Sequence, residues 1–323
     1  MIHLEKNSVI YILCPSVKYT GGPLALHQLG FKLINAGFNV YMYYQPETKN
    51  PVNDNFKKFK IPYTFSVNDD SKNLLIVPET LTRHLFYFRK IRKAIWWLSI
   101  DNFYKTTLKN TLGRLLRVIK KFSFKNADKY YHFTQSRYAY EYLKEKQKIS
   151  TDKLYMLSDY LFEEFLTNVN YDLNKKENIV LYNPKKGFEF THKLISRSKM
   201  KIKWVPIENM TSSEVKDSLL KAKIYIDFGK HPGKDRFPRE AAICGCCVIT
   251  GKNGAAAYHE DIPIPKEFKF SDEEAEINAI LEKIHFILNN YESEQQKFRK
   301  YIDIILSQEK IFEKEINKIF LMN

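Results

Sequence analysis

Short apolar runs alternate with amphipathic segments through the first half of the chain. Residues 9–14 are predicted to form a buried strand, residues 24–36 a helix that Gly37 ends, and residues 39–44 the next strand. This order is a βαβ unit, and its first loop contains a pair of glycines. Further elements follow: strands at 74–77, 94–98 and 130–134, and a helix that begins after Ser136.

The second half repeats this alternation after a polar stretch at residues 168–178. The predicted order is strand 179–182, loop 183–187, helix 188–196, strand 202–205, helix 212–221 and strand 224–228. Beyond residue 271 the apolar positions recur at helical spacing. The chain is therefore predicted to be an α/β protein with largely parallel sheets. Its predicted parts are a first domain at 1–170, a second at 171–295, and a C-terminal helix at 296–323 that returns to the first domain.

A charged loop follows the strand at 224–228. It contains His231, Lys234 and Arg236 beside prolines and a glycine, and an Ala-rich helix is predicted to open at Glu240 and to end at Gly245. In α/β folds ligands bind at the carboxyl ends of strands, where helix amino termini offer free N–H groups to phosphate. Residues 231–240 are therefore predicted to be an anion-binding loop.

A second loop of this kind lies at residues 183–187. Lys185 and Lys186 precede Gly187 there, between a predicted strand and a predicted helix. Glycine lets the backbone approach a phosphate closely, while the two ammonium groups compensate its charge. Lysines in a turn are also often merely solvated, so both interpretations stay open for this loop.

Composition narrows the class of protein. A length of 323 residues suggests about two domains, and the formal net charge of +15 indicates an anionic partner. No run of about 18 apolar residues is present to span a bilayer, and the first residues lack the pattern of a secretory signal, so we expect a cytoplasmic protein. The four cysteines match neither a disulfide framework nor a zinc site: Cys14, Cys244, Cys246 and Cys247.

Basic and aromatic residues are concentrated between residues 83 and 125. Residues 105–125 contain seven lysines and arginines and no acidic residue, with apolar residues at helical spacing, and Trp96 and Trp97 precede them. This pattern suits an anionic surface on the inner face of the membrane, contacted by Trp96, Trp97 and the basic helix. A surface helix whose apolar stripe faces its own core has the same pattern, so both interpretations stay open.

Together these features resemble GT-B glycosyltransferases and, among them, the large group-1, or GT4-like, family. That family has a glycine loop followed by a helix and a Gly-x-x-Val turn, matched here by Gly21, Gly22 and residues 37–40. Its signature Glu-Ala-x-x-x-Gly-x-x-Val-Ile is matched by residues 240–249. The resemblance implies two Rossmann-like domains facing a central cleft, the first for the acceptor and the second for a nucleotide-sugar donor.

One position departs from the family pattern. The family has a second glutamate eight residues before the one matched by Glu240, and Pro232 stands there in this chain. The resemblance implies that the Glu240 carboxylate hydrogen-bonds donor hydroxyl groups, whereas Pro232 indicates a divergent branch that holds the transferred sugar differently. The pair His231 and Pro232 is also similar to one in some bacterial sialyltransferases, so the nucleotide stays open.

Glycosyl transfer requires the charge of the leaving diphosphate to be neutralised. Basic side chains and helix N–H groups can do this, so we expect no metal and no other cofactor. We also expect His231 to contact the transferring phosphate as a catalytic residue. The predicted donor-binding set is Gly21, Gly22, Lys185, Lys186, Lys234, Arg236 and Glu240.

Two carboxylates in the first half are candidates for the catalytic base. Glu79 and Asp101 each follow a predicted strand, and either could accept a proton from an acceptor hydroxyl group. A retaining enzyme relies on the donor phosphate instead, so these residues leave the stereochemistry open. An N-cap role also explains Asp101.

We therefore predict a metal-independent glycosyltransferase of the hexosyltransferase type. Its acceptor would be a glycan or lipid-linked glycan in the synthesis of a bacterial-type surface polysaccharide, such as lipopolysaccharide or capsule, and no nucleic acid is expected as a partner. An NAD-dependent oxidoreductase is disfavoured, because the spacing G-x-x-G does not follow Gly22. The alternative is a non-enzymatic protein that binds nucleic acid or another anionic surface through residues 105–125.

Overall fold

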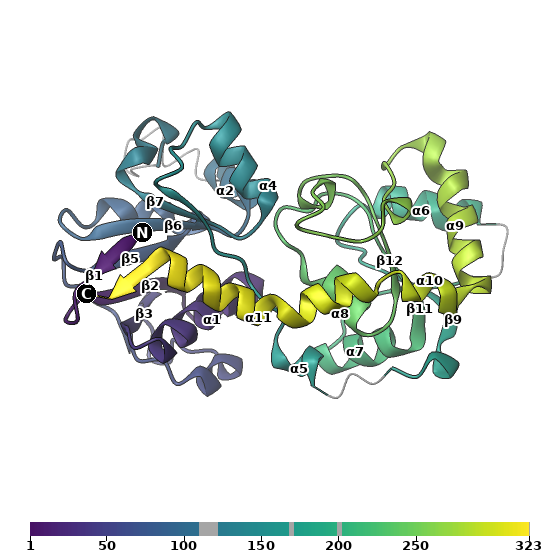
Figure 1. The fold of residues 1–323 in the computed structure, drawn as a ribbon, viewed down its shortest axis with the longest axis horizontal. Helices are drawn as coiled ribbons and strands as arrows, with labels where there is room; N and C mark the ends of the chain where they lie inside the picture. The colour runs from purple at the N-terminus through teal and green to yellow at the C-terminus, as the bar shows by residue number, and fades with distance from the viewer. Residues whose placement is uncertain (110–121, 168–170, 199–201, 323) are drawn as a thin grey trace. The chain divides into compact units, whose positions relative to one another are not determined.

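The computed structural model describes residues 1–109, 122–167, 171–198 and 202–322. The chain forms two compact units (Figure 1). Unit 1 comprises Met1–Asp159 and Lys310–Asn323, and unit 2 comprises Tyr160–Glu309. The chain passes from unit 1 to unit 2 after Asp159, about ten residues before the predicted domain boundary at residue 170. It returns to unit 1 after Glu309, inside the C-terminal helix predicted to begin at residue 296.

Unit 1 is built on a seven-stranded parallel sheet with the order β4-β3-β2-β5-β6-β7-β8. Its inner strands are buried along their length, which explains why they appear in the sequence as apolar runs. The predicted strands of the first half are confirmed. The strands are β2 (Val9–Pro15), β3 (Asn39–Gln45), β4 (Tyr63–Thr64), β5 (Leu74–Pro78), β6 (Arg92–Trp97), β7 (Tyr131–Thr134) and β8 (Leu154–Met156).

Helices connect these strands. The predicted βαβ unit is confirmed, although its helix begins at Gly21 and not at residue 24. Ser136 caps the next predicted helix, because its Oγ accepts a hydrogen bond from the N–H of Ala139 (3.1 Å). The α-helices of this part are α1 (Gly21–Asn35), α2 (Ile100–Lys109) and α4 (Arg137–Glu141), and 3₁₀ segments include η1 (Asp54–Phe59) and η2 (Glu79–Phe86).

Unit 2 is built on a four-stranded parallel sheet with the order β10-β9-β11-β12. The predicted strands and helices of the second half are present, but the helix expected to open at Glu240 begins at Arg236. The strands are β9 (Glu177–Tyr182), β10 (Lys203–Pro206), β11 (Ala222–Asp227) and β12 (Cys247–Thr250). The helices are α5 (Glu163–Leu166), α6 (Phe188–Arg197), α7 (Ser212–Lys221), α8 (Arg236–Ile243), α9 (Ile277–Asn289) and α10 (Tyr291–Gln296).

The end of the chain is bound to the start of unit 1. Helix α11 (Arg299–Ile319) leads into β13 (Phe320–Met322), which pairs in parallel with β1 (Ile2–Leu4), so the two termini lie side by side (Figure 1). On the same helix, Glu313 forms an ion pair with Lys32 (2.7 Å) and Phe312 stacks on Trp96. The last residues are therefore an integral part of unit 1.

Trp96 and Trp97 are buried in unit 1, so the prediction that their side chains contact a membrane is wrong. Both side chains are 0% exposed. They lie on β6, an inner strand that pairs with β5 and β7, and the last four residues of this strand are buried. Their indole N–H groups donate internally, Trp96 to the Leu157 carbonyl (2.9 Å) and Trp97 to His132 Nδ1 (2.9 Å).

Most of the predicted basic helix lies outside the described residues. Helix α2 includes its first residues, and the description resumes at Phe122, which is buried. Among the described helices, none combines the length and apolar character needed to cross a bilayer. The four cysteines are buried free thiols, as expected for packing groups.

Candidate functional site

Two glycine turns meet at the carboxyl edge of the unit 2 sheet. Gly187 follows β9 with φ = +53° and Gly229 follows β11 with φ = +91°, both in the left-handed region that favours glycine. A Cβ on Gly187 would lie 2.5 Å from the Phe228 carbonyl group, and one on Gly229 would lie 2.6 Å from the Gly187 nitrogen. The absence of both side chains lets the two loops pack backbone against backbone.

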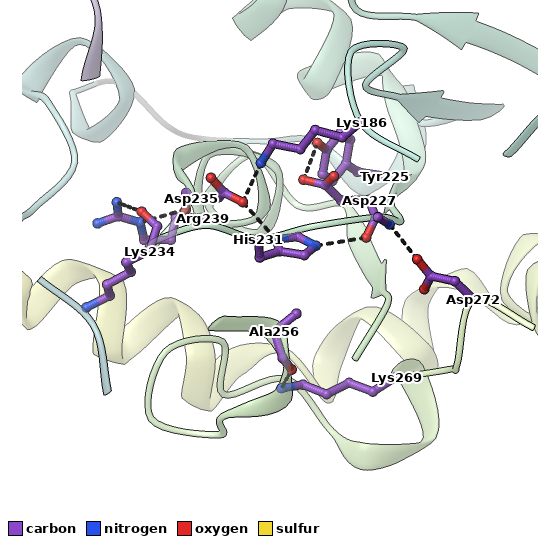
Figure 2. Close-up of polar contacts among 11 residues, drawn as sticks. Lys186, Tyr225, Asp227, His231, Lys234, Asp235, Arg239, Ala256, Lys269 and Asp272 are labelled. Atoms are coloured by element: carbon purple, nitrogen blue, oxygen red, sulfur yellow. Dashed lines mark hydrogen bonds and ion pairs between the residues drawn. The ribbon is translucent and has the colours of Figure 1, made fainter. Parts of the chain in front are cut away.

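This contact brings Lys186 to the charged loop. Its ammonium group forms an ion pair with Oδ2 of Asp235, the residue directly before α8, and the Nδ1 atom of His231 lies 2.8 Å from the same oxygen (Figure 2). The other ring nitrogen of His231 lies 3.1 Å from the backbone carbonyl oxygen of Asp227. Lys186, Asp227, His231 and Asp235 therefore form one group, here called the ion cluster.

Asp227 closes the ion cluster at the end of β11. Its Oδ2 accepts a hydrogen bond from the Tyr225 hydroxyl group (2.9 Å), as Figure 2 shows. Its Oδ1 is buried and has no hydrogen-bond partner among the residues that the structure describes. An unsatisfied carboxylate oxygen inside a protein is costly, so its persistence here points to a functional site.

Burial and charge act against each other in the ion cluster. Burial raises the pKa of Asp227, and the neighbouring His231 and Lys186 only partly oppose this. Burial also raises the pKa of Asp235, but the hydrogen bond from His231 and the Lys186 ammonium group outweigh it and hold the pKa below its ordinary value. Burial lowers the pKa of His231, whereas the carboxylates of Asp235 and Asp227 raise it to a net value above the ordinary 6.5.

His231 lies inside the protein. It is 0% exposed, contrary to the expectation of a loop histidine that contacts a phosphate directly. Both ring nitrogens face oxygen atoms of the protein, which favours the doubly protonated imidazolium form. The residue holds the carboxylate of Asp235, and its catalytic contact with substrate stays a prediction.

The loop after β12 covers the histidine. Gly254 has φ = +64°, and a Cβ there would lie 2.2 Å from the His231 carbonyl oxygen. That oxygen accepts a hydrogen bond from the Ala255 N–H (2.9 Å). Asp272 fixes the neighbouring turn, because its Oδ2 accepts from the Gly229 N–H (2.7 Å) and from the Asn253 side chain (3.1 Å).

Helix α8 carries the remaining predicted donor-binding residues. Arg236 lies in its first turn, with Nε 3.7 Å from Glu240 Oε1, and Glu240 is 2% exposed in the second turn. Burial raises the pKa of Glu240, while Arg236 and then Arg239 oppose the shift. Arg239 is fully buried and donates to the carbonyl groups of Lys234 (3.1 Å) and Asp235 (3.2 Å), which fixes the loop before the helix (Figure 2).

Three side chains of the ion cluster have the composition of a metal site. The ligand atoms of Asp227, His231 and Asp235 lie within 4.8 Å of one another. However, the Lys186 ammonium group and the imidazolium already supply two positive charges beside the two carboxylates. A metal ion would have to displace a proton from His231 and compete with Lys186 for Asp235.

The other predicted residues lie elsewhere. Lys185 is exposed beside Lys186, and its backbone N–H donates to Asn183 Oδ1 (3.0 Å). In unit 1, Gly21 and Gly22 form the first turn of α1. No single site of unit 2 therefore contains the whole predicted donor-binding set.

The two candidate bases follow neighbouring strands of unit 1. Glu79 is 3% exposed, and its Oε2 accepts a hydrogen bond from the Leu98 N–H (3.1 Å). Burial raises its pKa to about 8, against the opposing backbone hydrogen bonds. Asp101 is in the first turn of α2 and accepts from the Tyr138 hydroxyl group at 3.3 Å.

Sequence reasoning missed Asp227 and Asp235 as members of the site. The available signals were an aspartate at the last position of a buried strand and an aspartate four residues after a histidine. It also missed Gly229 and Gly254, whose positive φ angles only the folded loops reveal.

Solved structures share this fold. A glycosyltransferase from Rickettsia africae is 14% identical, with a TM-score of 0.60 over 96% of this chain and 99% of that chain. Anabaena HepE, in complex with UDP-glucose, is 11% identical, with a TM-score of 0.65 over 96% of this chain and 98% of that chain. The lipopolysaccharide outer core galactosyltransferase WaaB is 11% identical, with a TM-score of 0.61 over 96% of this chain and 98% of that chain.

Sequence comparison adds no assignment. No family model matches the chain, and no curated protein sequence matches it. At the identities above, the structural similarity establishes the fold. The chain has the GT-B glycosyltransferase fold, as predicted from its sequence.

Proposed function

We propose that the chain is a glycosyltransferase that moves a sugar from a nucleoside diphosphate sugar to a glycan or lipid-linked acceptor. The observation that carries this proposal is the ion cluster, in which Lys186 is held beside a charged loop at the carboxyl edge of a parallel sheet. That edge is where α/β folds bind phosphate-bearing ligands. The GT-B fold supports the same activity.

Lys186 is the residue proposed to compensate the leaving diphosphate. Its ammonium group pairs with Asp235, whose side chain is 19% exposed. A diphosphate carries more negative charge than one carboxylate and would take over this ammonium group. Asp235 would then keep the imidazolium of His231 as its partner, so the exchange leaves no buried charge uncompensated.

Two further cations are proposed to contact the donor. Lys234 and Arg236 flank the start of α8, where helix N–H groups and the helix dipole favour negative charge. Glu240 lies one turn further on and binds Arg236, so we propose that it orients this guanidinium group as well as donor hydroxyl groups. This arrangement needs no metal ion for charge compensation.

The acceptor side of the proposed reaction is in unit 1. Glu79 and Asp101 stay candidates for the base, and the raised pKa of Glu79 keeps its carboxyl group largely protonated at neutral pH. Glu79 would therefore act as a base only at alkaline pH. This difference makes the two candidates distinguishable by experiment.

A role in surface polysaccharide synthesis at the cytoplasmic face of a membrane is part of the proposal. The described surface offers exposed Tyr87 beside the exposed basic residues Arg83, Arg89 and Lys90. Aromatic and basic side chains of this kind suit anionic headgroups. They replace Trp96 and Trp97 as the residues that support a peripheral location.

Donor turnover tests the proposal. The purified chain would be incubated with sugar nucleotides of UDP, GDP, dTDP and ADP and with CMP-linked sugars, and nucleotide release would be measured. We expect release from one nucleotide class, and UDP-glucose is the first choice because HepE was solved with it. Neither binding nor turnover of any of these donors would contradict the proposed function.

A further inference from the structure

Unit 1 contains a pocket far along the chain from the ion cluster. It has a volume of about 270 Å³ and lies between α1, the end of β3 and the segment 50–63. Pockets that bind small ligands start at about this size. The pocket is at the carboxyl end of a parallel strand, the edge at which α/β sheets bind ligands.

The inner wall of the pocket is aromatic and tightly held. His27 and Phe56 stack with ring centroids 4.1 Å apart, and both are buried. The Nδ1 of His27 lies 2.6 Å from the Pro23 carbonyl oxygen, so Nδ1 carries the proton and Nε2 accepts from the Tyr44 hydroxyl group (2.7 Å). Burial lowers the pKa of His27 to about 4, which keeps this ring neutral. The wall is therefore fixed and uncharged.

The rim of the pocket is exposed and positively charged. Tyr63 is 45% exposed and meets Tyr44 edge to face at 5.9 Å. Lys57 and Lys60 line the pocket beside it, and Lys57 Nζ forms an ion pair with Asp54 Oδ1 (2.7 Å). Asn50 adds an amide group to the same lining. An exposed tyrosine ring, an amide group and cations at the rim suit a sugar ring with an anionic substituent.

The pocket also lies next to the start of α1. His27 is five residues after Gly22 on the same helix, which corresponds to roughly 7–8 Å along the helix axis. A ligand seated against His27 therefore lies near the glycine pair that opens α1. An acceptor chain bound there would reach the end of the sheet at which β2 and β3 finish.

We propose that this pocket binds an anionic sugar unit of the acceptor, carrying a carboxylate or a phosphate group. The exposed ring of Tyr63 takes the apolar face of the sugar ring, and Lys57 and Lys60 take the negative charge. That this sugar belongs to an acceptor rests on the proposed function, whereas the binding of an anionic sugar to the pocket does not. The inference names a substrate class for unit 1.

Ligand binding to the full chain tests the inference. The dissociation constants of glucose 6-phosphate, glucuronate, glucose and inorganic phosphate would be measured by calorimetry, with saturation-transfer NMR to detect weak binding. We expect at least one of the two anionic sugars to bind at least tenfold more tightly than glucose and than inorganic phosphate. The anionic sugar that binds more tightly shows whether the pocket prefers a phosphate or a carboxylate group.

Matched variants locate the binding. In the double variant Lys57→Ala/Lys60→Ala the anionic sugar should bind at least tenfold more weakly, and Tyr63→Ala should weaken glucose and anionic sugars alike. Lys58→Ala makes the same kind of charge change between the two lysines and should leave binding unchanged, because Lys58 does not line the pocket. Unchanged binding in the double variant, or sugars that bind no better than inorganic phosphate, would overturn the inference.

Donor binding in the same samples separates the two proposals. If nucleotides bind and anionic sugars do not, the pocket assignment fails and the proposed function stands. If anionic sugars bind through Lys57 and Lys60 but no nucleotide binds, the pocket stands and the proposed function fails.

Discussion

The Nδ1 atom of His231 lies 2.8 Å from Oδ2 of Asp235, and this contact joins a fully buried imidazole to the residue that precedes helix α8. Lys186 pairs with the same oxygen from a different loop. One carboxylate thus fixes two cations, of which Lys186 is the more exposed. The proposed charge compensation of a phosphate by Lys186 rests on this arrangement, because His231 would remain to compensate Asp235.

The first prediction concerns the charge of His231. Asp235→Asn removes the carboxylate that raises the pKa of the imidazole, so this pKa should fall towards or below 6.5. Histidine titration by long-range ¹H–¹⁵N NMR measures this shift. Asp303→Asn, a substitution at an exposed position of α11, should leave the titration unchanged. An unaltered His231 titration in Asp235→Asn would contradict the ion cluster.

The pH dependence of the free energy of unfolding tests the same prediction in a second way. The raised pKa of His231 stabilises the fold below about pH 6.5, and this contribution is lost as the pH rises through the folded-state value. The lowered pKa of Asp235 stabilises the fold above about pH 3.8, and its contribution is lost as the pH falls. Urea unfolding should therefore show the largest difference between wild type and Asp235→Asn at pH 4–6.5.

The second prediction concerns the glycine contact. Gly187→Ala should destabilise the protein by about 2 kcal/mol or more, because the residue has φ = +53° and its Cβ would lie 2.5 Å from backbone atoms of Phe228. Gly21→Ala is the control, because in the described part of the chain a Cβ there meets no atom within 4 Å beyond its own helix, and alanine favours helix. Urea unfolding of the two variants measures the difference, and equal stability would contradict the role of the glycine contact.

Most elements could be predicted from local patterns. The inner strands are buried on both faces, so β2, β5 and β11 appear as apolar runs with clear ends. The start of α8 was missed, because Arg236, Pro238 and Arg239 look like a loop in sequence. Proline is tolerated in the first turn of a helix, and the guanidinium group of Arg239 is held by carbonyl groups that only the folded loop brings near.

Burial was harder to predict than secondary structure. Trp96 and Trp97 are beside basic residues in sequence, yet Phe312 stacks on Trp96 and His132 accepts a hydrogen bond from Trp97 in the interior of unit 1. His231 is beside proline and glycine in sequence, yet the loop at Gly254 covers it. In each case the deciding contact comes from a distant part of the chain. The ion cluster depended on such contacts too, since Lys186 and Asp235 are 49 residues apart.

The third prediction concerns Glu79. Its pKa of about 8 exceeds the ordinary 4.5, so the folded protein binds this proton more strongly and loses stability as the pH rises from about 4.5 to 8. Glu79→Gln removes this loss, and its stability relative to wild type should increase with pH by on the order of 1 kcal/mol per unit. Urea unfolding at pH 5 to 8 measures it. A constant difference across this range would contradict a buried, protonated carboxyl group.

Activity then discriminates between the two candidate bases. If Glu79 is the base, kcat/KM should rise with pH through about 8, and Glu79→Gln should abolish the rise. If Asp101 is the base, Asp101→Asn should abolish turnover and Glu79→Gln should retain the wild-type pH profile. Retention of full activity by both variants would remove both residues from the chemistry.

The fourth prediction concerns metal ions. Turnover should survive treatment with EDTA, because Lys186 and the imidazolium of His231 occupy the positions around Asp235 that a cation would take. Initial rates with EDTA, and with added Mg²⁺, Mn²⁺ or Zn²⁺, measure this. Activity that disappears with EDTA and returns with one metal would assign the Asp227, His231 and Asp235 group to that ion.

Nucleotide binding to wild type and Lys186→Ala tests the central claim most directly. Calorimetry with the diphosphate of the preferred donor, and thermal unfolding with that ligand, would be compared with Lys221→Ala, an exposed lysine at the end of α7. At about 100 times its dissociation constant the nucleotide should stabilise wild type and Lys221→Ala by about 2.7 kcal/mol. Lys186→Ala should bind the diphosphate at least tenfold more weakly while keeping its fold. Equal diphosphate affinity in Lys186→Ala and wild type would contradict the role of the ion cluster.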